Sequence, residues 1–146
     1  MKQLATFLRT AVAASALAFV SLAAHAATVS FHAHLKGPWE VPANTTTGTG
    51  MLTATLDTDT NVFTYHVEYS GLTGPAMAAH FHGPSSETGT AGPQVAVKKP
   101  ITSPIDGTAT LTADQAKDLL NEQWYFNIHT AANPGGEIRG QVQQTK

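Results

Sequence analysis

The chain of 146 residues has no cysteine, a formal net charge of −2 and only 12% charged residues. Without cysteine there are no disulfide bonds and no thiolate metal ligands, and without a basic stripe we expect neither nucleic acid nor an anionic membrane as a partner. The polar surface must come from Thr, Gln, Asn and His, and a Thr-rich composition favours β-structure.

The N-terminus has the features of a secretory signal peptide. Lys2 and Arg9 precede an uncharged apolar run that ends near Ala24, where a small-x-small cleavage pattern follows. The apolar run is too short to span a bilayer comfortably, and no second candidate follows it. We therefore predict a signal peptide over 1–26, one domain over 27–146 and a periplasmic or secreted location without a membrane span. An uncleaved N-terminal anchor is the alternative.

Beyond the predicted cleavage site, short segments of alternating apolar and polar residues are separated by Gly, Pro, Asn and Asp. Alternation with a period of two predicts strands. The turn-forming residues of 57–61 predict a hairpin loop, and 85–93 and 99–107 are expected to be longer connections. The predicted strands, in chain order, are 31–35, 50–56, 62–69, 76–82, 94–98, 108–111, 124–129 and 137–142.

One helix is predicted after the sixth strand. Thr112 and Gln115 have the spacing of a capping box, and Ala116, Leu119 and Leu120 follow at helical spacing. About eight short strands with one short helix predict a mainly β fold, either an antiparallel β-sandwich or a Greek-key barrel.

The histidines of the predicted domain all occupy polar positions in the alternating pattern of their strands. Each alternates with apolar residues, so in regular strands all of them project from the face opposite the apolar one. If some of these strands are neighbours in one sheet, the imidazoles converge on a shared patch. The histidines concerned are His32, His34, His66, His80, His82 and His129.

Other polar and aromatic residues support less specific interpretations. Glu137 and Arg139 are expected to form an exposed strand pair of little energetic weight, or alternatively to orient an imidazole from behind. Asn127 is also a candidate for orienting an imidazole, whereas no sequence pattern selects Glu40 as a ligand. Trp39 is expected in the core or at its rim rather than as a platform for a sugar ring.

Several segments resemble the CHRD (chordin) domain family. They occur in the family's order and together span nearly the whole predicted domain, with one departure at Ala43, where the family usually carries a second Pro. The resemblance implies a β-rich extracellular or periplasmic module, and its motif carries over His80, His82 and His129 as the core of a possible site. The segments are 35–42, 71–72, 79–84, 92–95, 125–130 and 134–141.

The spacing of the histidines is typical of metal ligands. Two histidines in a His-x-His pair lie roughly 6.5–7 Å apart at the backbone, so both imidazoles can reach one ion. All-imidazole ligation suits copper or zinc and does not suit calcium or magnesium. We therefore predict a copper site, with zinc as the alternative metal and surface histidines without a metal as the competing interpretation. The predicted ligands are His80, His82, His129 and His66, with His32 and His34 as the second choice for the fourth position or as a separate site.

Three functions remain open from the sequence. The first is copper handling or resistance by an exported protein. The second is a copper-dependent enzyme similar to superoxide dismutase, because copper/zinc superoxide dismutases also use a His-x-His strand pair on a β-sandwich. The third is a non-enzymatic module that binds another exported protein. The physiological metal, the oligomeric state and any partner's identity are not fixed by the sequence.

Overall fold

Strands account for most of the regular structure in residues 27–146, which are the residues that the structure, a computed structural model, describes. The predicted signal peptide, 1–26, lies outside the described residues. The elements in chain order are β1 (Thr28–Lys36), the 3-10 helix η1 (Gly37–Trp39), β2 (Thr49–Asp57), β3 (Val62–Ser70), β4 (Ala76–His82), β5 (Pro93–Ala96), β6 (Ile105–Thr110), α1 (Ala113–Leu120), β7 (Tyr125–Thr130), β8 (Ile138–Gln141) and β9 (Gln143–Gln144).

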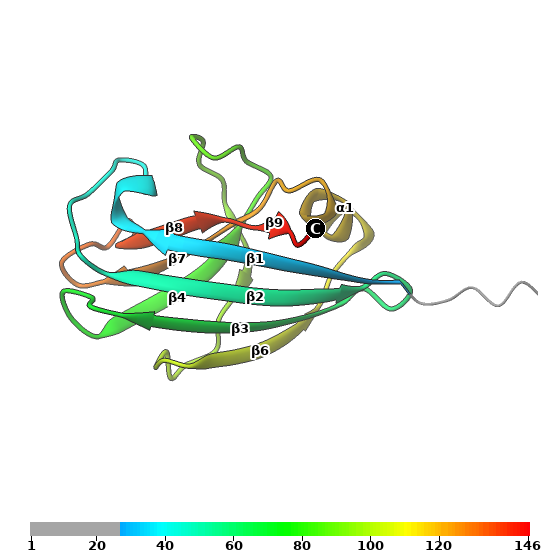
Figure 1. Cartoon of the computed structure of the whole chain (residues 1–146), viewed down its shortest axis with the longest axis horizontal. Helices are drawn as coiled ribbons and strands as arrows, with labels where there is room; N and C mark the ends of the chain where they lie inside the picture. Colours follow the sequence, from blue (N-terminus) through cyan, green and yellow to red (C-terminus); the bar gives the residue numbers. More distant parts are fainter. Residues whose placement is uncertain (1–26) are drawn as a thin grey trace, which may run out of the picture.

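The strands form one antiparallel sheet in the order β5-β4-β7-β8-β1-β2-β3-β6, and β9 pairs with β1. Figure 1 shows this sheet curling back on itself, with β1, β2, β3 and β6 in front of β4, β7 and β8. The sheet is therefore barrel-like and nearly closed, and its inner face encloses the core. The predicted mainly β antiparallel fold is confirmed.

The β2–β3 hairpin illustrates how the sequence pattern produces the sheet. Leu52 pairs with Val67, and both side chains are fully buried. In the connecting turn, the Asp57 carboxylate accepts hydrogen bonds from the backbone N–H groups of Asp59 and Thr60, at 3.0 and 2.9 Å. Alternation therefore sets which face is buried, and the turn fixes the register of the pair.

An aromatic cluster fills the centre of the barrel. The rings of Phe63 and Phe126 pack against Phe81 of β4, with ring centroids 5.0 and 4.7 Å away, and Trp124 joins them. All four side chains are fully buried. Truncation of such a residue to Ala typically costs about 3–5 kcal/mol, so Phe81 firmly fixes the orientation of β4. Its neighbours along β4 consequently point outward.

The predicted helix is confirmed together with its cap. The Thr112 hydroxyl accepts the backbone N–H of Gln115 at 3.2 Å, and the Gln115 side chain accepts the N–H of Thr112 at 2.9 Å. Leu119 and Ala116 face the core, so α1 closes one end of the barrel (Figure 1). Within residues 27–146, no helix has the length and apolar character needed to cross a membrane.

The observed strands differ most from the predicted ones at β6 and β9. β6 begins at Ile105, inside the predicted connection 99–107, because Ile105 is buried and pairs with Val67 of β3. β9 was not predicted, since two residues are too few to show a period. It nevertheless pairs with β1 and brings the end of the described chain back to the first strand.

Candidate metal centre

Two adjacent strands, β4 and β7, bring three histidines together. His80 and His82 alternate with Ala79 and Phe81, whose side chains are buried in the core, so both histidines project from the outer face of β4. On β7, His129 lies opposite Ala78 and therefore diagonally across from His80. The antiparallel register thus places the third imidazole beside the His-x-His pair.

The potential ligand atoms of these three residues, the histidine cluster, lie close together. One ring nitrogen from each of His80, His82 and His129 can be chosen so that all three lie within 4.8 Å of one another. The shortest approach is between Nδ1 of His80 and Nε2 of His129, at 3.2 Å. Nitrogens bound to one ion at about 2.0–2.1 Å must lie within about 4.2 Å of one another, so only small side-chain adjustments separate this arrangement from a metal-bound one.

Backbone carbonyls orient two of the three imidazoles. Nδ1 of His82 lies 2.9 Å from the carbonyl oxygen of Ala91, and Nδ1 of His129 lies 3.0 Å from that of Pro134. A carbonyl oxygen can only accept, so Nδ1 of His129 carries the proton and its Nε2 keeps the lone pair. In His82 both ring nitrogens face oxygen acceptors, because the Asn127 side-chain oxygen lies 3.1 Å from Nε2, so these contacts orient the ring without selecting a tautomer. A metal-binding histidine commonly has the arrangement of His129, in which the nitrogen that does not bind the ion donates to an acceptor.

The environment favours the neutral form of His80 and His82. Burial lowers the pKa of His80, and the neighbouring charges of His129 and His82 would lower it further. Burial also lowers the pKa of His82, despite its hydrogen bonds. Neutral imidazole is the form that binds metal, so the lowered pKa values of His80 and His82 favour metal binding.

Tyr125 and Arg139 support the cluster from the side. The rings of His82 and Tyr125 are stacked, with centroids 4.8 Å apart and planes 3° from parallel. The guanidinium of Arg139, on β8, lies 3.5 Å from the Tyr125 ring centroid. Because β7 lies between β4 and β8, Tyr125 is held between an imidazole and a cation, which restricts the movement of His82.

The buried Asn127 connects the cluster to a carboxyl group. Its side-chain oxygen lies 3.1 Å from Nε2 of His82. Glu40 is also buried, and burial raises its pKa to about 7, although the charge of Arg139 and polar contacts from Asn127 and the Val41 backbone act in the opposite direction. The sequence prediction gave Asn127 a possible orienting role but did not select Glu40, because a glutamate in a loop carries no pattern that reveals burial.

The other predicted ligands lie elsewhere on the outer face. His66 is on β3, which β1 and β2 separate from β8 in the sheet order, and its Nδ1 lies 2.6 Å from the Asp106 carboxylate. That hydrogen bond raises the pKa of His66. His32 and His34 share the outer face of β1, with ring centroids 6.3 Å apart. The structure therefore does not bring His66, His32 or His34 into the histidine cluster, and His66 does not supply it with a fourth imidazole.

The expectation of an exposed Glu137–Arg139 pair is wrong. Both side chains are fully or almost fully buried, and they have different partners. The Glu137 carboxylate accepts hydrogen bonds from the Thr73 N–H and from the hydroxyls of Thr46, Thr73 and Thr130, at 2.6–2.7 Å. Strand periodicity could not reveal this burial, because it depends on loops that fold over the outer face.

Sequence reasoning also missed the carbonyl groups of Ala91 and Pro134 that orient the imidazoles. Every residue has a carbonyl, so no side-chain pattern could have identified these two. Tyr125 was placed in a strand, but the register that stacks it on His82 depends on which strands are neighbours. The sequence could have pointed to Tyr125 only through its place in the predicted strand 124–129, which ends at His129.

Comparison with known proteins identifies the family. The family model of the CHRD domain matches residues 31–142, which is more than half of the chain and includes the histidine cluster and both carbonyl-bearing loops. No curated protein and no solved structure matches the chain. The matched range contains all the segments on which the resemblance in the sequence rests, and the chain belongs to the CHRD domain family.

Proposed function

We propose that the histidine cluster binds one copper ion and that the protein handles copper outside the cytoplasm, in storage, delivery or resistance. The observation that carries the proposal is the convergence of His80, His82 and His129 from two paired strands, with backbone carbonyl groups orienting two of the rings. Without a ligand function, three imidazoles would have no evident reason to face one another.

The donor set favours copper. The three converging ligands are imidazoles, and the chain has no cysteine to supply a thiolate. Among first-row divalent ions, nitrogen ligands bind Cu²⁺ most tightly, and Zn²⁺ binds more weakly at the same site. A three-histidine set leaves room for a water molecule or a ligand from a partner, which suits an ion that must be acquired and released.

The proposed location depends on the predicted signal peptide. An exported protein meets copper outside the reducing cytoplasm, and a domain without cysteine cannot be damaged there by copper-catalysed thiol oxidation. Fractionation of cells that produce the full chain, with mass spectrometry of the exported form, tests this part separately from the metal site.

The experiment that tests the metal site is a copper titration of the 27–146 protein in competition with a chromophoric chelator. The test variant is His80→Ala/His82→Ala, and the matched control is His32→Ala/His34→Ala, which removes an equivalent His-x-His pair from the outer face of β1. We expect one equivalent of copper in the parent and the control. In the test variant, affinity should fall by at least about a hundred-fold.

Circular dichroism of each variant checks that the fold is retained. Equal copper binding by the parent and the His80→Ala/His82→Ala variant would refute the proposed site. An equal loss in both double variants would show adventitious binding to surface histidines. Tighter binding of zinc than of copper, with the same dependence on the cluster, would refute the choice of metal and retain the site.

A further inference from the structure

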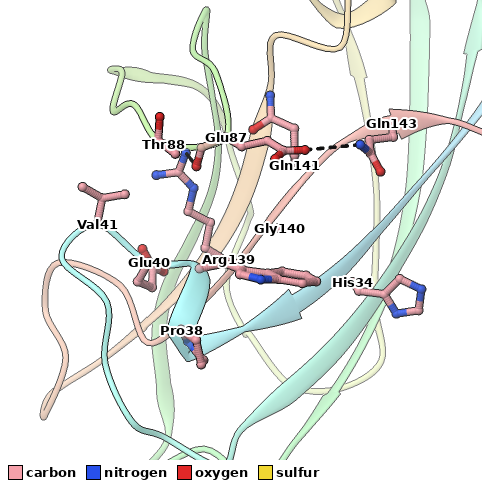
Figure 2. A pocket seen from close by; sticks show the side chains of 11 residues that line it. His34, Pro38, Glu40, Val41, Glu87, Thr88, Arg139, Gly140, Gln141 and Gln143 are labelled. Carbon is pink, nitrogen blue, oxygen red and sulfur yellow. Dashed lines mark hydrogen bonds between the residues drawn. The ribbon is translucent and has the colours of Figure 1, made fainter.

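The outer face of β1 and β2 carries a second set of side chains with metal-ligand atoms. The antiparallel register places His34 of β1 directly opposite Met51 of β2. Side chains that face each other in this way have Cβ atoms about 4.5–5.5 Å apart, so an imidazole nitrogen and a thioether sulfur can approach one ion together. Figure 2 shows the His34 ring extending from β1 away from Arg139, which lies on the side of the histidine cluster.

Met51 interrupts a row of threonines. The other outward residues of β2 are Thr49, Thr53 and Thr55, all exposed, and Met51 itself is 42% exposed. A threonine would suit an exposed strand position at least as well, so the stability of the sheet does not account for the methionine. A single exposed apolar residue would carry no implication by itself. This one lies across the strand pair from an imidazole, and what it adds there is a polarizable sulfur.

The two histidines of β1 can both turn toward this sulfur. The ring centroids of His32 and His34 are 6.3 Å apart, with the ring planes at 82°. His34 is exposed, and His32 is half-buried with one long ring contact, 3.4 Å from its Nδ1 to the Thr145 hydroxyl. Because neither ring is held by a short hydrogen bond within residues 27–146, rotation of the side chains can bring one nitrogen from each to a shared ion.

His34 and Met51 also border the same open space on the surface. They line a pocket with a volume of about 480 Å³, together with Glu68 and Lys36. Glu68 lies directly opposite Met51 on β3, so a carboxylate adjoins the thioether and attracts a cation. The Lys36 ammonium opposes a cation, but it lies over the Trp39 ring, 5.2 Å from the centroid. The pocket is therefore accessible to a small positive ion.

The donor set differs from that of the histidine cluster. Thioether sulfur selects Cu(I), whereas zinc is bound by imidazole, thiolate and carboxylate groups. His66 is already paired, with its Nδ1 2.6 Å from the Asp106 carboxylate. We propose that His34 and Met51, with His32 as the third ligand, bind one copper(I) ion. The site shares no strand with the histidine cluster and does not depend on the function proposed for it.

The first test is an NMR titration with silver(I), a redox-inert ion that prefers the same soft ligands as copper(I). Residues 27–146 contain two methionines, Met51 and Met77, so ¹³C labelling of the methionine methyl groups gives one signal for each. The titration uses His80→Ala/His82→Ala, in which the histidine cluster cannot compete. We expect Ag⁺ to shift the Met51 methyl and leave that of Met77 unchanged, and we expect Zn²⁺ to shift neither. Adding His32→Ala/His34→Ala should weaken the response by about ten-fold or more.

The second test is an anaerobic titration of copper(I) against a copper(I)-specific chelator. Met51→Leu removes the sulfur and keeps an apolar side chain of similar size, and Met77→Leu is the matched control because Met77 is 52% exposed on β4. Met51→Leu should weaken the binding of one copper(I) ion by about ten-fold or more, and Met77→Leu should not.

Four results would overturn the inference. They are an Ag⁺ titration that shifts neither methyl signal or both alike, a Zn²⁺ shift of the Met51 methyl equal to that of Ag⁺, a Met51 response unchanged without His32 and His34, and equal copper(I) affinities for Met51→Leu and Met77→Leu. A Met51 response in His80→Ala/His82→Ala supports the inference whether or not the histidine cluster binds copper.

Discussion

The outer face of the sheet has two regions that look alike in sequence and differ in structure. Over β4, β7 and β8, which we call the covered end, Asn127, Tyr125 and Arg139 are buried although they point away from the core. Over β2, β3 and β6, the bare end, His66 and Glu68 remain open to solvent. Periodicity assigns both regions to the outer face, so the difference lies in the loops that fold over one of them.

The comparison shows that a polar residue in a strand acquires its role from what lies above it. At the covered end, loop carbonyls orient imidazoles and hydroxyls surround a carboxylate. At the bare end, water solvates the charged groups and weakens each interaction. The strand determines which way a side chain points. The loop above it determines whether the side chain is buried and which hydrogen-bond partners it has.

The largest expected effect is at Glu137 of the covered end. Glu137→Leu removes the acceptor of the Thr73 N–H and of the hydroxyls of Thr46, Thr73 and Thr130. We expect a loss of about 3–5 kcal/mol in the free energy of unfolding, measured by urea denaturation. Glu68→Leu, at the bare end, is the control and should change stability little. Equal midpoints for the two variants would abolish the distinction between the two ends.

A second effect concerns Glu40, whose buried carboxyl lacks a partner for one oxygen. Burial raises the pKa of Glu40 from 4.5 to about 7, so the folded protein binds more protons than the unfolded chain between these values. This group's stabilising contribution is therefore fully present below about pH 4.5 and is lost as the pH rises through 7, by up to about 3 kcal/mol.

Urea denaturation of the parent and of Glu40→Gln over this pH range measures the effect. The amide does not titrate, so the difference in the free energy of unfolding between the two proteins should grow with pH. Glu137 acts in the opposite direction: although burial pushes its pKa upward, hydrogen bonds from Thr130, Thr46 and Thr73 hold the pKa at about 2. Its contribution is present above about pH 4.5 and is lost only as the pH falls toward 2. A parallel pH profile for parent and Glu40→Gln would contradict the assignment to Glu40.

The histidines sharpen the comparison through their titration. Burial lowers the pKa of His80, whereas the Asp106 hydrogen bond raises that of His66. In an NMR titration of the metal-free protein, the His66 ring signals should therefore move at higher pH than those of His80. Asp106→Asn should lower the midpoint of His66 and leave His80 unchanged. The reverse order of the two midpoints would show that the covered end does not shield its imidazoles.

The smallest expected effect is on stability at the bare end. His66→Asn removes the ion pairs with Asp106 and Glu68, but all three side chains are well exposed. Solvent screening leaves such pairs with little net contribution. The urea midpoint of His66→Asn should therefore match that of the parent within experimental error, and a clear destabilisation would show that these charges contribute more than their exposure suggests.

The sequence was sufficient for the parts of the molecule that depend on local patterns. Alternation identified strands such as β2 and β3, and the spacing of Thr112 and Gln115 identified the helix cap. The parity of the histidines placed all of them on the outer face. Sheet order could not be predicted in the same way, because an outward histidine is compatible with any neighbouring strand. His66 was therefore grouped with histidines on strands that do not pair with β3.

Burial on the outer face was the other feature that the sequence did not reveal. Arg139 and Glu137 have the alternation expected of exposed residues. Their environment is set by contacts from the loops 37–48, 71–75 and 83–92 and from Tyr125 and Thr130 of β7. The resemblance to the family carried over His80, His82 and His129, and these are the histidines that the fold brings together, whereas periodicity alone did not separate them from the others.

The position of β7 and β8 in the sheet order has a consequence for how the chain assembles. These late strands lie between β4 and β1, so they join the β4–β5 pair to the β1–β2–β3–β6 group. A chain cut before Tyr125 would expose two unpaired strand edges, on β4 and β1, and such edges promote aggregation. Limited proteolysis that removes 125–146 should therefore yield an insoluble remainder rather than a smaller folded domain, because this segment joins the two halves of the sheet.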